Sequence, residues 1–190
     1  MGFETVKTLT MSPGVTVDIQ VNADEPETSI DRYAVDTICT GKSGTDAFYV
    51  PPHWHKALRD ISKHHSEHFT VLEGRVAVTI DGVKHVIRAG DPVLFVPART
   101  VHSIQGFKGE RLVVRERADP AGDYKAVFFS DVFSTGSFGT LADIPHMLRA
   151  FYDGDTYLAL PLYFRFFDEV FMTIAGGLAH LIAPKRVKTL

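Results

Sequence analysis

The stretch "PPHWHKALRDISKHHSEHFTVLEG", residues 51–74, contains five of the nine histidines of this 190-residue chain and an acid, Glu67, just before an apolar run. If "PPHWH" continues the preceding strand-like segment "DAFYV", His53 and His55 project from one face, because side chains alternate along a strand. Glu67 opens the next expected strand, and a long intervening loop costs little extra closure entropy. The sequence therefore predicts that these three side chains meet.

A fourth side chain, His102, lies downstream in "AGDPVLFVPARTVHSIQ", where it begins a strand after a proline-marked turn. Three imidazoles and one carboxylate form a nitrogen-rich set, which suits Fe, Mn, Ni, Cu or Zn better than Mg or Ca. His64 and His65 stand closer to Glu67 in the sequence and are competing ligands. A polar loop beside a strand, without metal, is the other interpretation.

The rest of the first 120 residues predicts a β-barrel or β-sandwich. From about residue 15 to 117, short alternating runs are separated by turn residues. The dipeptide Asp81-Gly82 is a strong hairpin signal, and Gly74 ends another run. The expected strands lie in "VTVDIQV", "RYAVDTICT", "DAFYV", "HFTVL", "RVAVTI", "HVIRA", "PVLFVP" and "RLVVRE". Most breaks are short, as in an antiparallel meander.

Residues 121–190 have a helical character and are expected to form an extension of the domain at residues 1–120. Pro145 is placed near the first turn of one helix, where its missing N–H does little harm. The apolar segment 158–182 is interrupted by three charged residues and its uncharged part is too short to cross a bilayer. We expect its helix to pack on the barrel or on a second subunit of a homodimer, because its many large apolar side chains need cover.

Composition and charge exclude several protein classes. The formal net charge is −3 and no Lys/Arg block occurs, so a nucleic-acid partner is not expected. The single cysteine, Cys39, allows no intramolecular disulfide and is expected in the core. The N-terminus "MGFETVKTLT" has no basic stretch followed by an apolar one, so a cytoplasmic location is expected.

The two histidine-containing segments together resemble the cupin superfamily. Its first motif corresponds to His53, His55, Glu67, six residues and Gly74; the second corresponds to "GDPVLFVPARTVH", from Gly90 to His102. Arg99 stands where the family usually has Gly. The resemblance implies a small antiparallel, jelly-roll-like barrel with its ligands pointing into the lumen, and His53, His55, Glu67 and His102 as metal ligands. The C-terminal part, with "ERLVVRERADPAGDYKAVFF", is similar to uncharacterised fungal cupins, a number of which occur in secondary-metabolite pathways.

Strand alternation also suggests what lines the cavity. The expected wall residues are Tyr49, Phe69, Phe95 and Ile104. Such a lining is apolar, with a polar cluster at one end, and no basic cluster or Gly-rich loop indicates a phosphate ligand. We therefore expect an apolar, oxygen-bearing small molecule as the substrate. The insertion between His55 and Glu67, residues 56–66, is expected at the barrel mouth as a lid.

Three function classes follow. The first is a metal-dependent enzyme, of oxygenase or lyase/isomerase type, whose divalent transition metal polarises a carbonyl or activates oxygen. The second is a metal-free isomerase or cyclase, including one for pericyclic cyclisation, in which Glu67 and a histidine transfer protons. The third is a binding module without chemistry. In either enzyme class, Glu67, His53 and His102 are the candidate catalytic residues.

Overall fold

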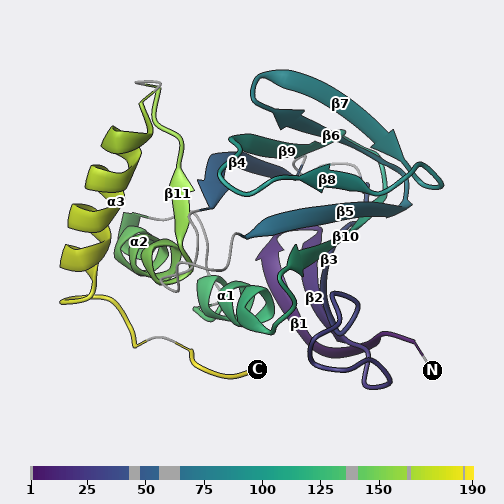
Figure 1. Cartoon of the computed structure of the whole chain (residues 1–190), viewed down its shortest axis with the longest axis horizontal. Helices are drawn as coiled ribbons and strands as arrows, with labels where there is room; N and C mark the ends of the chain where they lie inside the picture. Colours follow the sequence, from purple (N-terminus) through teal and green to yellow (C-terminus); the bar gives the residue numbers. More distant parts are fainter. Residues whose placement is uncertain (1, 43–47, 56–64, 136–140, 162–163, 186) are drawn as a thin grey trace.

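Two antiparallel sheets face each other in the computed structural model, which describes residues 2–42, 48–55, 65–135, 141–161, 164–185 and 187–190 (Figure 1). The six-stranded sheet has the order β1-β2-β3-β10-β5-β8 and the five-stranded sheet the order β11-β4-β9-β6-β7. The first sheet contains β1 (Glu4–Ser12), β2 (Val15–Val21), β3 (Tyr33–Cys39), β5 (Ser66–Glu73), β8 (Leu94–Val96) and β10 (Leu112–Asp119). The second contains β4 (Tyr49–His55), β6 (Arg75–Ile80), β7 (Val83–Arg88), β9 (His102–Gly106) and β11 (Thr156–Leu158). The mainly β, antiparallel fold expected from the sequence is confirmed.

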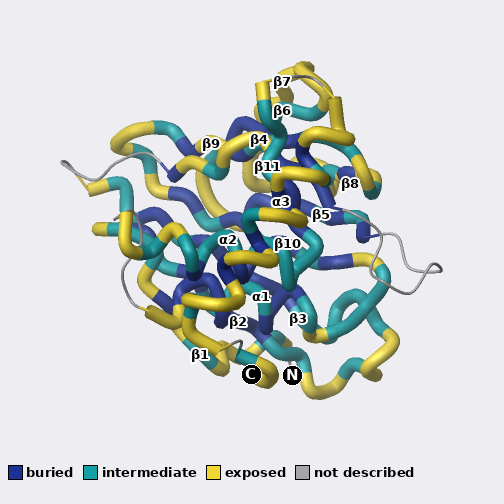
Figure 2. The backbone as a smooth tube through the Cα atoms, turned by 90° about the vertical axis from the view of Figure 1, so that its left-hand side faces the viewer, coloured by how far each residue is buried: buried dark blue, intermediate teal, exposed yellow. Residues whose placement is uncertain are grey.

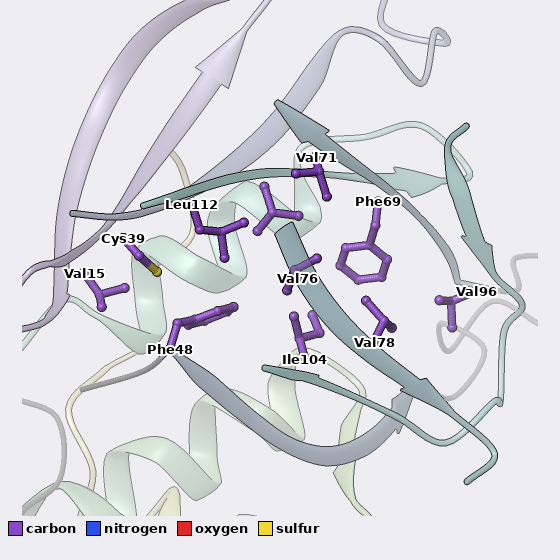
Figure 3. Close-up of a cluster of buried hydrophobic side chains, with 11 residues drawn as sticks. Val15, Cys39, Phe48, Phe69, Val71, Val76, Val78, Val96, Ile104 and Leu112 are labelled. Carbon is purple, nitrogen blue, oxygen red and sulfur yellow. The ribbon is translucent and has the colours of Figure 1, made fainter. Parts of the chain in front are cut away.

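The core lies between the two sheets because alternate strand residues point inward. In β2 the buried face carries Val15, Val17 and Ile19, of which Val15 packs in the barrel and the other two pack toward the helices. Figure 3 shows the barrel cluster, to which both sheets contribute apolar side chains. Its buried members are Val15, Cys39, Phe48, Phe69, Val71, Val76, Val78, Val96, Ile104, Leu112 and Val114. Cys39 is thus the core residue that the sequence predicts.

Two turns have a backbone geometry that accounts for the residues found in them, the Asp81-Gly82 pair and Arg99. Asp81 and Gly82 have φ values of 45° and 83°, and they join β6 to β7 in a tight hairpin. Positive φ at both central residues is the geometry for which an Asp-Gly pair is favoured. Arg99, before β9, has φ of 63°. This left-handed conformation explains why glycine suits the position, and here an arginine adopts it at a cost of about 1–2 kcal/mol.

Three helices follow the barrel strands. They are α1 (Tyr124–Val132), α2 (Ile144–Asp153), preceded by the 3-10 turn η1 (Leu141–Asp143), and α3 (Arg165–Ala179). Helices α1 and α2 pack against each other, α1 also contacts β2 and β3, and α2 also contacts α3 (Figure 1). A second core cluster, with Val17, Ile19, Val132 and Phe133, fills the space between the sheet and these helices. Pro145 lies in the first turn of α2, as expected.

The C-terminal part is joined to the barrel by a strand as well as by helices. β11 pairs with β4, with Tyr157 opposite Trp54, whose ring it stacks on at 4.7 Å. The Trp54 indole N–H donates to the Asp168 carboxylate of α3 at 2.9 Å. The division expected at residue 120 stays an interpretation of the sequence. In the structure, β11, which follows residue 120, belongs to the same sheet as β4, which precedes it. Neither β1 nor β11 was anticipated.

Among the residues that the structure describes, none of the helices has the length and hydropathy needed to cross a membrane. The longest, α3, spans Arg165–Ala179.

Candidate metal centre

Three strands bring the predicted ligands together. His53 and His55 lie on β4 with the fully buried Trp54 between them, facing the opposite side. His53 pairs in register with His102 of β9, and Glu67 lies on β5 in the facing sheet. Because β4 and β9 are neighbours and β5 faces them, the four side chains enter the barrel lumen from both sheets.

The four residues form one compact, buried cluster. His53, His55, Glu67 and His102 each offer a ligand atom within 4.8 Å of every other. Glu67 Oε2 lies 2.8 Å from His102 Nε2, and Glu67 Oε1 lies 3.0 Å from His55 Nε2. Sequence reasoning from strand alternation and motif spacing therefore placed these residues together correctly. Their role as ligands remains a proposal.

Atoms outside the cluster set the tautomer of each histidine. The Nδ1–H of His53 donates to the Pro51 carbonyl at 2.8 Å, and that of His102 to the Thr100 carbonyl at 3.1 Å. The third imidazole, His55, has Nδ1 3.2 Å from the Thr156 hydroxyl, which itself donates to the Gly154 carbonyl. Each imidazole therefore holds its proton on Nδ1, and each Nε2 has a free lone pair.

These lone pairs point to a cation. Among the described residues, His55 Nε2, His102 Nε2 and Glu67 Oε2 are buried without a hydrogen-bond partner of acceptable geometry. Two acceptors that lie 2.8–3.0 Å apart repel each other unless a proton or a metal ion lies between them. The donor set therefore fits a divalent transition metal held by three imidazoles and a carboxylate.

The pKa values favour the same protonation states. Burial, with the neighbouring His102 and His55, lowers the pKa of His53 well below its usual value. Burial also lowers the pKa of His55, although Glu67 opposes that shift. Burial alone would raise the pKa of Glu67, but the Lys125 ammonium, with the neighbouring His55 and His102, holds it well below its usual range. Neutral imidazoles and an ionised carboxylate are the forms that bind metal.

The chain also matches a known protein family. Residues 46–114 match the family model described as a cupin domain. This chain carries a cupin domain. A search of curated proteins gave no match.

The chain is also similar to solved structures at low sequence identity. KdgF from Halomonas sp. is 21% identical, with 65% of this chain and 96% of that chain covered and a TM-score of 0.45. An RmlC-like cupin from Shewanella frigidimarina is 20% identical, with 64% and 96% covered and a TM-score of 0.43. A salicylate 1,2-dioxygenase variant from Pseudoaminobacter salicylatoxidans in complex with gentisate is 18% identical, with 58% and 26% covered and a TM-score of 0.41.

A buried lysine and a second glutamate adjoin the cupin cluster, and sequence reasoning missed both. Lys125, on α1, is 6% exposed, and its ammonium forms ion pairs with Glu67 and with Glu116 of β10. Burial lowers the pKa of Lys125, and Glu67 opposes the shift. Two carboxylates and one ammonium leave this buried group with one net negative charge, which a cation can balance.

The structure describes only one of the two competing ligands, His65. His65 is buried, and its Nε2 lies 3.8 Å from Glu67 Oε1, while its ring centroid is 4.4 Å from that of His55. It stands beside the four-residue cluster and outside the set whose ligand atoms all converge. Of the expected lid segment, residues 56–66, the part from 56 to 64, which includes His64, lies outside the described residues.

A cavity of about 230 Å³ opens from the cluster. It is small compared with the ~300–1,000 Å³ of drug-sized sites, and its walls are mainly apolar. Of the four predicted wall residues, Tyr49 and Ile104 line it. The remaining apolar walls are formed by Met11, Phe48, Val50, Phe128, Phe129, Val132, Phe133, Met147, Phe151 and Leu158.

The other two predicted wall residues lie elsewhere. Phe69 points inward but packs in the barrel core, where its ring centroid is 6.2 Å from that of His102. Phe95 is 48% exposed and contacts His68, because β8 pairs Phe95 with His68 and turns Val96 inward. The expectation that Phe69 and Phe95 line the cavity is therefore corrected, in the second case because the strand register is offset by one residue.

Proposed function

We propose that this cupin is a metal-dependent enzyme that acts on an apolar, oxygen-bearing small molecule in the barrel cavity. His53, His55, Glu67 and His102 would hold a divalent transition metal, one of Fe, Mn, Ni, Cu or Zn. The observation that carries the proposal is the orientation of the histidines: each keeps its Nδ1–H on an outer partner and presents Nε2 to the cluster. Such outer partners are typical of metal-binding histidines.

The bound ion would supply a Lewis acid that polarises a carbonyl or activates oxygen. The chain's own residues do the rest. The apolar walls exclude water and orient the substrate, with Tyr49 at the rim, where it is 51% exposed, and Ile104 deeper inside. Glu67, His53 and His102 are the proposed catalytic groups because they border the cavity or contact groups that do. A setting in secondary metabolism is supported only by the resemblance of the sequence.

A second candidate is a metal-free isomerase or cyclase. It is supported by the direct contacts of Lys125 with Glu67 and Glu116, which place three ionisable side chains in one buried ion-pair network beside the cavity. This network could move a proton to and from a bound substrate while the apolar walls fix the conformation of the substrate.

A homodimer through α3 is also part of the proposal. Large apolar side chains are exposed along this helix and its flanks: Phe164, Phe166, Phe167, Val170, Phe171, Ile174, Leu178, Leu181 and Ile182. At ~150–250 Å² for a whole aromatic side chain, their exposed parts amount to roughly 900 Å². A standard stable interface takes ~800 Å² from each partner, so a second copy of the chain would suffice to cover this surface.

Metal analysis of protein purified without chelator tests the proposed function. We expect about one transition-metal ion per chain, and its loss in the double variant His55→Ala with His102→Ala. His85→Ala is the matched control, because His85 is exposed on β7. Metal retained by the double variant would contradict the proposed site. An active preparation that lacks metal would favour the isomerase or cyclase.

A further inference from the structure

The Lys125 ammonium has one N–H donor that its two ion pairs do not use. The ammonium carries three N–H groups, and two are accounted for by the ion pairs with Glu67 and Glu116. Lys125 also lines the cavity, as do both carboxylates. The side chain enters from the first turn of α1, so it reaches the cluster from the helical side of the barrel. Lys125 therefore stands at the cavity wall beside the four-residue cluster, with one N–H that these two ion pairs do not use.

Lys125 is also the only cationic side chain among the described residues that line the cavity. The remaining acid of the wall, Asp153, is already paired with Arg149 at 3.3 Å and with His180 at 3.1 Å. The other polar wall groups are hydroxyls and imidazoles, and most of the lining is apolar. A ligand that carries an anionic oxygen would therefore find one place to put it, at the end of the cavity where Lys125 stands.

The charges agree with a ligand of one negative charge. Without an ion, the ionised groups Glu67, Glu116 and Lys125 sum to one negative charge. A divalent ion turns this into one positive charge, which is costly in an apolar enclosure unless an anion balances it. The metal and Lys125 lie on the same side of the cavity, so a single oxyanion could be close to both.

We propose that Lys125 is the specificity residue of this site and that the substrate is a small, otherwise apolar molecule with one ionised oxygen, a carboxylate or an enolate. Lys125 donates its third N–H to that oxygen, while the aromatic side chains of α1 and α2 enclose the apolar remainder. This inference rests on the proposed metal function, since the metal makes the pocket positive. The inference narrows the expected class of substrate from any apolar, oxygen-bearing molecule to one with an ionised oxygen.

Two matched probes test the inference on the metal-loaded full chain: 2-naphthoate and its neutral analogue 2-naphthamide. Dissociation constants are measured by calorimetry for wild type, Lys125→Met, Lys125→Arg and the control Lys84→Met, whose lysine is exposed on β7. We expect wild type, Lys84→Met and Lys125→Arg to prefer the acid roughly tenfold or more, as a charged hydrogen bond of ~1.5–3 kcal/mol implies. Because the metal still attracts an anion, Lys125→Met should keep part of the preference, reduced roughly tenfold or more, and should keep its affinity for the amide.

Metal content and circular dichroism, measured on the same samples, separate the possible failures. Equal binding of both probes by wild type, binding of neither, or a preference that is undiminished in Lys125→Met would overturn the inference. So would loss of metal and of amide binding together in Lys125→Met, because Lys125 would then only support Glu67. A wild-type chain that binds no metal would refute the metal function and this inference with it, whereas a metal-loaded chain without the preference would refute the inference alone.

A structural measurement covers the case in which Lys125→Met does not fold. Crystals of wild type with 6-bromo-2-naphthoate locate the bromine by anomalous scattering and so orient the ring. A carboxylate within hydrogen-bonding distance of Lys125 Nζ supports the inference, and a carboxylate directed elsewhere overturns it.

Discussion

At the scale of single residues, the site depends on atoms that are not ligands. His53 and His102 are oriented by backbone carbonyls two residues before them, within β4 for His53 and in the turn before β9 for His102. His55 differs, because its partner is the Thr156 hydroxyl of β11, a hundred residues away in the chain. The C-terminal part of the chain therefore contributes to a site whose proposed ligands all come from the first 102 residues.

Substitution of Thr156 tests this dependence. Thr156→Val keeps the side-chain shape but removes the acceptor for the His55 Nδ1–H, so the imidazole loses its fixed orientation. We expect the metal affinity, measured by competition with a chromogenic chelator, to fall by about 10–100-fold. Thr156→Ser, which retains the hydroxyl, should bind metal like wild type. If Thr156→Val has the wild-type affinity, the hydroxyl does not orient His55 and the account of this residue is wrong.

The clustering of the four proposed ligands could be predicted from the sequence, but Lys125 could not. His53 and His55 share strand parity, and the positions of Glu67 and His102 follow from the resemblance to the cupin motifs. In "DYKAVFF" the lysine has the pattern of an ordinary helix residue, and only the packing of α1 on the barrel buries it. Glu116 did leave a signal: it shares strand parity with the buried Leu112 and Val114.

At the scale of elements, alternation predicts which way a side chain points but not how strands align. Ile104 follows His102 by two residues and faces the lumen, as expected. Phe95 was misplaced because β8 has only three residues and its register is set by pairing with β5, which is a contact distant in sequence. Phe69 points inward as predicted. Strand alternation does not show whether an inward side chain lies in the packed core of the barrel or beside its cavity, and Phe69 lies in the core.

No local sequence signal indicated β11, or that β11 and α3 attach to the ligand-bearing strand β4. β11 is three residues long, and it pairs with β4 beside the site histidines. Asp168 of α3 accepts from both the Trp54 indole and the Leu160 backbone N–H, each at 2.9 Å. Because Trp54 lies between His53 and His55, this carboxylate connects the helix to the ligand-bearing strand. The helix itself was foreseen from its apolar period, whereas its attachment depends on contacts distant in sequence.

At the scale of the whole molecule, the most exposed apolar surface lies on α3, away from the barrel. Figure 2 shows this helix on the side that faces the viewer, with exposed segments along it. Its buried side, with Met172 and Gly176, packs on the rest of the chain, and its outer side carries Phe166, Ile174 and Leu178 at 70%, 58% and 61% exposure. A helix that is apolar on two sides is expected to be covered on both.

Charged substitutions on this outer side test the homodimer. Ile174→Glu together with Leu178→Glu places like charges on the proposed interface, so multi-angle light scattering should show a dimer for wild type and a monomer for the variant. Val83→Glu is the control, since Val83 is 60% exposed on β7, far from α3 in the fold. Truncation near Asp155 would be less informative because it also removes Thr156. A wild-type monomer, or a dimer unaffected by the two glutamates, would contradict the proposal.

The most direct test of the central claim, that His53, His55, Glu67 and His102 hold one transition-metal ion, is X-ray absorption spectroscopy at the metal edge of protein loaded with one equivalent of metal. We expect a single environment with three imidazole nitrogens and at least one carboxylate oxygen, and loss of imidazole scattering in the variant with His55→Ala and His102→Ala. A spectrum of oxygen ligands alone, or one with fewer than three imidazoles in wild type, would contradict the account.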